Sequence, residues 1–198
     1  MNSAGWAHRI ASVNDLKHVI RPVRGDEWEQ VKALRIAALG DPAAPVAFLE
    51  TVEQAEARPD GFWQERALGA SHGRAARQFV AVAPNGQWDG TVVVLVEEGG
   101  TTDFFDQDVE QAQGHLVGVF VRPEQRGTGL TEALFGAALE WAWSLEEPLL
   151  ERVRLMVHEE NARAAAFYRR YGFVPSGSAV AVPGDPAAKE LEYVFPRP

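Results

Sequence analysis

The stretch that decides the fold is VFVRPEQRGTGLTEALFGAALEWAW, which runs from Val119 to Trp143. It begins with β-branched and aromatic residues, passes through a proline and a charged turn that contains two glycines, and continues as a helical pattern. A strand that leads through a glycine turn into a helix N-terminus is a common way to hold phosphate on main-chain N–H groups. The stretch therefore predicts a strand, a phosphate-binding turn and a helix.

Three kinds of phosphate-binding turn can be compared with this segment. A Walker loop needs Lys and Ser or Thr after its last glycine, but residues 130–131 are Leu-Thr. A dinucleotide fingerprint needs a third glycine where Glu132 stands. In the remaining kind, Gly127 and Gly129 let several N–H groups converge, and the helix N-terminus and Arg126 add positive charge. Such a turn suits a pyrophosphate that is bound without a metal.

Composition narrows the classes of partner. The chain has 198 residues, of which 46% are hydrophobic and 24% charged, as in ordinary globular domains. A net charge of −9 disfavours nucleic acid, because phosphate backbones need a basic surface. The absence of cysteine excludes disulfides, thiolate metal sites and a cysteine nucleophile. No signal-peptide pattern and no membrane-length apolar run occurs, so we expect a cytoplasmic protein that binds neither nucleic acid nor membrane.

The order of predicted elements indicates a mixed α/β domain with one sheet. Residues 1–17 have no clear period and are expected to be an N-terminal extension, followed by one domain over residues 18–198. Strands are predicted at 18–24, 78–83, 91–97, 115–121, 152–158, 180–183 and 190–195. Helices are predicted at 25–40, 51–57, 60–69, 131–145 and 161–172.

A second motif, NARAAAFYRRYGF (Asn161–Phe173), follows the first at a distance of one helix and one strand. An Asn opens a helix that carries an aromatic-Tyr pair and ends before Gly-Phe. With Arg126 and Gly129 of the turn, this motif resembles the GNAT superfamily, the acetyl-CoA-dependent N-acyltransferases. Thr131 departs from the Gly or Ala that ends the family's turn motif. The resemblance covers residues 78 to 195.

The resemblance implies a single domain with a mixed, mostly antiparallel central sheet flanked by helices, and acetyl-CoA as co-substrate without a metal. It implies that main-chain groups of one strand grip the pantetheine arm and that N–H groups of the turn hold the pyrophosphate. Asn161 and Phe167 are expected to contact the arm as well. The implied cofactor residues are Val119, Phe120, Val121, Arg126, Gly127, Thr128, Gly129, Leu130, Thr131, Asn161 and Phe167. The alternatives are structural: a buried strand, a helix cap at Asn161, and a core residue at Phe167.

Tyr168 is the implied general acid. When an amine attacks a thioester, a thiolate leaves, and a phenol with a pKa of about 10 is still protonated at neutral pH and can protonate it. The alternative is a half-buried structural tyrosine. The general base is not assigned. His115 and Glu159 are the first candidates. The alternatives are His158, the acids of the 97–113 loop, and deprotonation through water without a dedicated base.

The predicted function is transfer of an acetyl group from acetyl-CoA to a primary amine of a small molecule or peptide, by direct attack. No covalent enzyme intermediate is expected, because the chain has no cysteine and no serine in an activated motif. The alternative is a non-catalytic acyl-CoA-binding sensor or interaction module. The acidic loop 97–113, which includes Phe104 and Phe105, is either solvated or a lip that steers a cationic amine. A homodimer is the default oligomeric state.

Overall fold

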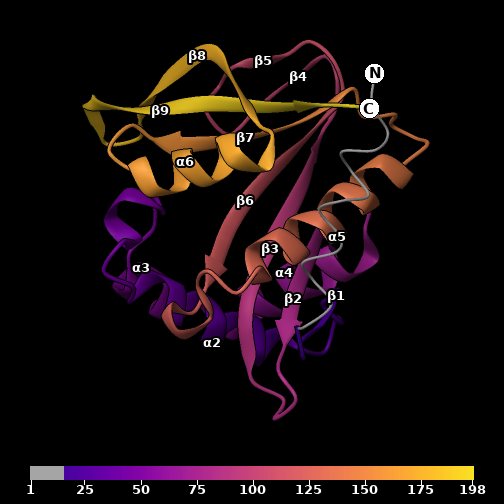
Figure 1. Cartoon of the computed structure of the whole chain (residues 1–198), viewed down its shortest axis with the longest axis vertical. Coiled ribbons are helices and arrows are strands. Elements are labelled where there is room, and N and C mark those ends of the chain that lie inside the picture. Colours follow the sequence, from indigo (N-terminus) through magenta and orange to yellow (C-terminus); the bar gives the residue numbers. More distant parts are fainter. Residues whose placement is uncertain (1–15) are drawn as a thin grey trace.

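The computed structural model describes residues 16–198, so the expected extension over residues 1–17 lies almost wholly outside the described residues. A seven-stranded sheet with the order β1-β2-β3-β6-β7-β9-β8 forms its centre (Figure 1). The β6–β7 pair is parallel, and the other neighbouring pairs of this sheet are antiparallel. The expected single domain with a mixed, mostly antiparallel sheet is therefore confirmed.

The elements follow the predicted order. The strands of the main sheet are β1 (Val19–Pro22), β2 (Ala76–Val82), β3 (Trp88–Glu97), β6 (Gln113–Val121), β7 (Arg152–His158), β8 (Val174–Val182) and β9 (Asp185–Pro196). The α-helices are α2 (Trp28–Leu39), α3 (Val52–Glu56), α4 (Asp60–His72), α5 (Leu130–Ser144) and α6 (Ala162–Tyr171). Two short 3₁₀ turns, η2 (Ala44–Val46) and η3 (Pro123–Gln125), complete the connections.

Helices cover both faces of the sheet. Helices α5 and α6 bury Leu134, Phe135 and Tyr168 against one face, in a core shared with β6 and β7. Helices α2 and α4 bury Leu34 and Trp63 against the other face (Figure 1). The turn of residues 122–129 leads into α5 on the first face, whereas α2 and α4 lie on the opposite face.

Strands β6 and β7 separate partway along their length (Figure 1). They pair only from Gln113–Leu116 to Arg152–Leu155, after which β6 stays with β3 and β7 stays with β9. Gly118, with φ +61°, lies where the β3–β6 register slips by one residue. This backbone conformation favours glycine, and such a bulge bends the strand. The β7-facing main-chain groups of residues 117–121 consequently have no strand partner.

Two segments differ from the prediction. The acidic loop 97–113 contains a short hairpin, β4 (Thr101–Thr102) with β5 (Asp108–Val109). Strand β8 begins at Val174, six residues before the predicted start at 180. Its early part is exposed and contains Pro175 and Gly177, so it lacks an alternating apolar pattern. Pairing of Val174 with Val194 on β9 defines this edge strand instead.

Candidate active site

The turn between β6 and α5 presents main-chain donors. Gly127 and Gly129 have φ values of +81° and +90°, which favour glycine, and α5 starts at Leu130 without a side-chain cap. Within residues 16–198, no hydrogen bond uses the N–H groups of Gly127, Gly129 or the first three residues of α5. These N–H groups and the helix N-terminus can together bind an anion such as a pyrophosphate. Thr131 lies in this first turn and is partly exposed.

Arg126 does not present its charge to this turn. Its guanidinium forms an ion pair with the buried carboxylate of Asp41, and its Nε donates to the Val121 carbonyl at 3.1 Å. Asp41 is the second residue after α2, and its Oδ1 also accepts from the Ala43 N–H at 2.9 Å. Arg126 therefore fastens the turn to the end of α2, and the main-chain N–H groups remain as the anion donors.

Asn161 caps α6, as the structural alternative predicted. Its Oδ1 accepts from the Ala164 N–H at 3.1 Å, and its Nδ2 donates to the Val46 carbonyl at 3.0 Å. The second bond joins the start of α6 to η2, which is distant in the sequence. Contact between Asn161 and a cofactor stays a prediction.

The side chains of β6 beyond its pairing with β7 lie in the two cores on either side of the sheet. Val121 packs on the α5 face, and Phe120 packs on the α2 face; each is 6% exposed. Val119 is partly buried on the α5 face. Phe167 meets Phe135 edge to face, with ring centroids 5.4 Å apart. Any ligand along this strand would therefore meet its main chain, while Phe167 belongs to an aromatic cluster.

Tyr168 is buried in that cluster with an unpaired hydroxyl. It is 8% exposed and stacks on Phe135 at 5.9 Å between centroids. Burial raises its pKa, and the negative charge of Glu190 raises this pKa further. No hydrogen bond within the described part of the chain uses its hydroxyl group. The phenol is thus protonated at neutral pH and has a free donor.

His115 belongs to a buried ionic network. Its ring is 3% exposed, and Nδ1 lies 2.8 Å from Oε1 of Glu97. Arg154 binds Glu97 at 2.8 Å and Asp103 at 2.6 Å. Burial opposes ionisation of Glu97, but the hydrogen bonds from His115 and Arg154 outweigh it and lower the pKa of Glu97 to about 2. This geometry favours a structural role for His115.

Glu159 is exposed and its carboxylate holds neighbouring backbone. Its Oε1 accepts from the Lys189 N–H at 2.9 Å, and its own N–H donates to the Lys189 carbonyl. Next to it, His158 Nδ1 accepts from the Glu160 N–H at 3.2 Å. Glu159 therefore links the end of β7 to β9.

Glu190 on β9 is a candidate that sequence reasoning missed. It lies directly opposite His158 in the β7–β9 pair and is 9% exposed. Burial raises its pKa, partly offset by His158, and no hydrogen bond within residues 16–198 uses its carboxylate. The alternation of Glu190 and Glu192 with Leu191 and Tyr193 was the signal available in the sequence, since it places both acids on one face of a strand.

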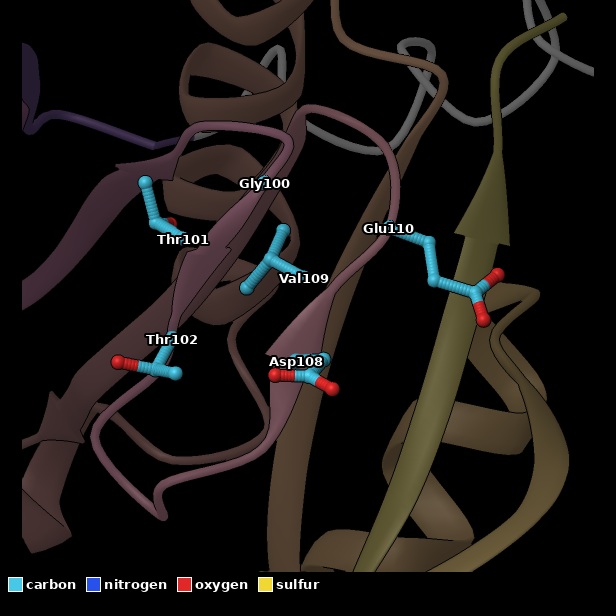
Figure 2. A pocket seen from close by; sticks show the side chains of 6 residues that line it. All are labelled: Gly100, Thr101, Thr102, Asp108, Val109 and Glu110. Carbon is cyan, nitrogen blue, oxygen red and sulfur yellow. The ribbon is translucent and has the colours of Figure 1, made fainter.

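Two hollows among residues 16–198 differ in character. The larger, about 560 Å³, lies on the β4–β5 hairpin; Figure 2 shows Thr102 and Asp108 projecting from its two strands and Glu110 pointing away from it. This hairpin joins β3 to β6 at the end where β6 still pairs with β7, so it is remote from the turn between β6 and α5. The smaller cavity, about 20 Å³, lies between α2, α4 and the sheet and borders Gly118. The smaller cavity therefore lies at the bulge of β6 near the point where β6 and β7 separate, whereas the larger hollow does not.

None of the helices within residues 16–198 has the length and apolar character needed to cross a bilayer, and no group of three or more His, Asp or Glu residues in this part of the chain is arranged to hold a metal ion.

Comparison with known proteins gives one family and one fold. The family model of the acetyltransferase (GNAT) family matches residues 44–173. No curated protein matches the sequence significantly.

The similar solved structures support the same fold. Ribosomal-protein-S5-alanine acetyltransferase from Vibrio fischeri has a TM-score of 0.66 at 17% identity, over 91% of this chain and 93% of that one. PaiA N-acetyltransferase from Thermoplasma acidophilum, in complex with coenzyme A, has 0.65 at 14% identity, over 91% and 100%. NAA60 from Arabidopsis thaliana, in complex with a bisubstrate analogue, has 0.63 at 16% identity, over 90% and 97%.

Proposed function

Since the chain belongs to the acetyltransferase (GNAT) family, we propose that it transfers the acetyl group of acetyl-CoA to a primary amine, by direct attack. The observation that carries the proposal is the buried phenol of Tyr168, which has a raised pKa and a free hydroxyl on the α5 and α6 side of the β6–β7 split. A proton donor of this kind is what departure of a thiolate requires.

The described residues fit acetyl-CoA. The free N–H groups of Gly127, Gly129 and the first three residues of α5 suit a pyrophosphate, and the β7-facing main chain of residues 117–120, which has no strand partner, suits an amide-containing arm. Arg126 contributes by fixing the turn through Asp41. PaiA, whose structure contains coenzyme A, has the same fold. A role for Thr131, Asn161 and Phe167 in binding remains part of the proposal.

Acetyl-CoA, when bound, supplies a thioester carbonyl for the amine to attack and a sulfur that leaves. Tyr168 donates its proton to that sulfur atom. Glu190 accepts a proton from the substrate ammonium, directly or through water, and its raised pKa makes it a stronger base than an ordinary carboxylate. The N–C bond forms as the C–S bond breaks. The nitrogen then releases its second proton to water, and Glu190 returns the first proton to the Tyr168 phenolate, so one proton ends on the thiol and one in the solvent.

Glu190 replaces His115 and Glu159 as the proposed base. His115 is enclosed in the network with Glu97 and Arg154, whereas Glu159 is bound to the Lys189 main chain. Glu190 is buried and makes no hydrogen bond within residues 16–198, and its negative charge raises the pKa of Tyr168, which supports assigning the base and the acid to one site. A cytoplasmic location, a homodimer and the absence of nucleic-acid partners stay predictions.

The experiment that tests the function is CoA thiol release from acetyl-CoA across a panel of small amines and peptides. We expect release with one class of amine. Acetyl-CoA binding without release from any amine would contradict the proposal and favour the acyl-CoA-binding module instead. Glu124→Gln, at an exposed position of η3, serves as the folded control that should keep wild-type turnover.

A further inference from the structure

Three arginines gather around one carboxylate on the α2 and α4 face. Arg35 on α2 and Arg58, just after α3, both bind Glu50, with Nε–O distances of 3.1 and 2.8 Å. Each also lies over an aromatic ring. Arg35 is 4.6 Å from the Phe48 centroid, and Arg58 is 4.3 Å from the Phe62 centroid. These two guanidinium groups are therefore held by both charge and stacking.

Arg66 on α4 has neither kind of partner. Within residues 16–198 it makes no hydrogen bond, ion pair or ring contact. Desolvation by the surrounding protein lowers its pKa, and the charges of Arg35 and Arg58 lower it further against the opposing effect of Glu50. Yet the residue is exposed. An exposed arginine that is crowded by protein lies in a concave surface, where an anion would relieve its unfavourable surroundings.

Arg66 lines the small cavity near the point where β6 and β7 separate. The lining is Val31, Leu34, Arg35, Ala38, Arg66, Gln78, Thr91, Val93 and Gly118. A volume of about 20 Å³ holds one group of the size of a water or an ammonium. Gly118 is the bulge residue from which β6 leaves β7. The cavity thus joins the arginine cluster to the proposed place of reaction.

Gln78 gives this cavity an unused acceptor. It is 5% exposed, and its Nε2 donates to Thr91 Oγ1 at 3.0 Å, which in turn donates to the Phe79 carbonyl at 2.9 Å. This chain fixes the amide orientation, because a flipped amide would place two acceptors against each other. Gln78 Oε1 is buried and has no hydrogen-bond partner. A buried carbonyl oxygen of this kind calls for an N–H donor.

We propose that the acceptor is a small amine that also carries an oxyanion, whose nitrogen binds Gln78 Oε1 beside Gly118 while its carboxylate or phosphate binds Arg66. This inference rests on the proposed acetyl transfer. The cavity admits only the amine end, so the anionic end stays at the exposed guanidinium. Polyamines are disfavoured, because the guanidinium groups of Arg35 and Arg66 line the cavity and repel a second ammonium.

The acidic hairpin does not offer a competing cation site. Glu97 and Asp103, two of the acids of the loop expected to form a lip, are bound to Arg154. The remaining hairpin acids lie near the paired end of β6 and β7, away from Gly118. The charge near the small cavity is therefore positive. It favours an acceptor that carries an anionic group, whereas an acidic lip formed by the 97–113 loop would favour a cationic acceptor.

The test compares amines that differ only in the anion. Glycine, β-alanine and γ-aminobutyrate are paired with ethylamine, propylamine and butylamine, and O-phosphoethanolamine distinguishes phosphate from carboxylate. We expect kcat/KM at least tenfold higher for one anionic amine than for its alkylamine partner. Arg66→Gln should raise KM for the anionic amine at least tenfold and leave the alkylamine within twofold. Arg74→Gln, an exposed arginine just beyond α4, is the matched control.

If turnover is absent, calorimetric titration of the same amines in the presence of CoA tests whether the protein prefers an anionic amine. Binding of an anionic amine that weakens tenfold in Arg66→Gln supports the inference even when the proposed transfer fails. Equal use or equal binding of both members of every pair overturns it, and so does the absence of both. A tenfold loss of acetyl-CoA affinity in Arg66→Gln, with acceptor KM unchanged, would assign Arg66 to the cofactor and also overturn it.

Discussion

Glu190 on β9 lies directly opposite His158 at the open end of β7, and its charge raises the pKa of the buried Tyr168 phenol. In the mechanism that we propose, the carboxylate with its raised pKa is the base and the protonated phenol is the acid. Two predictions follow from this pair.

Glu190→Gln should lower kcat/KM at least a hundredfold, the usual range for loss of a general base. Activity needs the ionised carboxylate, and its folded pKa is raised, so wild-type kcat/KM should fall as pH decreases through a value above that of an ordinary glutamate. That acidic limb should disappear in the variant. If Glu190→Gln keeps the pH profile of the wild type, Glu190 is not the general base and another group has this role.

Tyr168→Phe should lower kcat at least tenfold and leave the dissociation constant of acetyl-CoA within twofold. The ring that packs on Phe135 is kept, while the proton donor to sulfur is lost. Thiol release and calorimetric binding measure the two quantities. Phe167→Tyr, on the neighbouring ring of the same cluster, tests whether a phenol at another position can substitute; we expect it not to restore turnover in the double variant.

Gly127→Ala should weaken acetyl-CoA binding about tenfold. Nothing lies near an added Cβ, so the cost arises from φ of +81°, where a side chain is disfavoured by about 1–2 kcal/mol and the N–H groups must turn away. Gly86→Ala is the matched control, because it has φ of +86° and open space but lies in the β2–β3 turn. Equal loss of acetyl-CoA affinity in both variants would show that strain alone, not the turn, is responsible.

Glu97→Gln should destabilise the fold by about 3 kcal/mol at pH 7, because Arg154 and His115 lose their shared carboxylate. The folded pKa of Glu97 is lowered to about 2, so its contribution is complete above its ordinary pKa of 4.5 and is lost as pH falls toward 2. Urea unfolding of both proteins from pH 7 to pH 3 checks this. A difference in free energy of unfolding that is constant with pH would contradict the assignment.

The two motifs carried most of what the sequence could predict. Gly127 and Gly129 predicted the turn because their positive φ values are a local property, and Asn161 predicted its helix cap for the same reason. The ion pair of Arg126 with Asp41 could not be predicted from the sequence, because the two residues are far apart in the chain and meet only in the folded structure. The same holds for Glu190, whose place depends on the pairing of β9 with β7.

Helix α2 gives the two halves of the site a common support. Its Arg35 belongs to the arginine cluster, and the residue that follows its C-terminal cap, Asp41, holds the turn that we assign to the pyrophosphate. A shift of this helix on binding one substrate would alter the affinity for the other, and thermodynamic linkage makes the two effects equal in size. We therefore expect the two substrates to bind cooperatively, by the same factor whichever binds first, which titrations in both orders would measure.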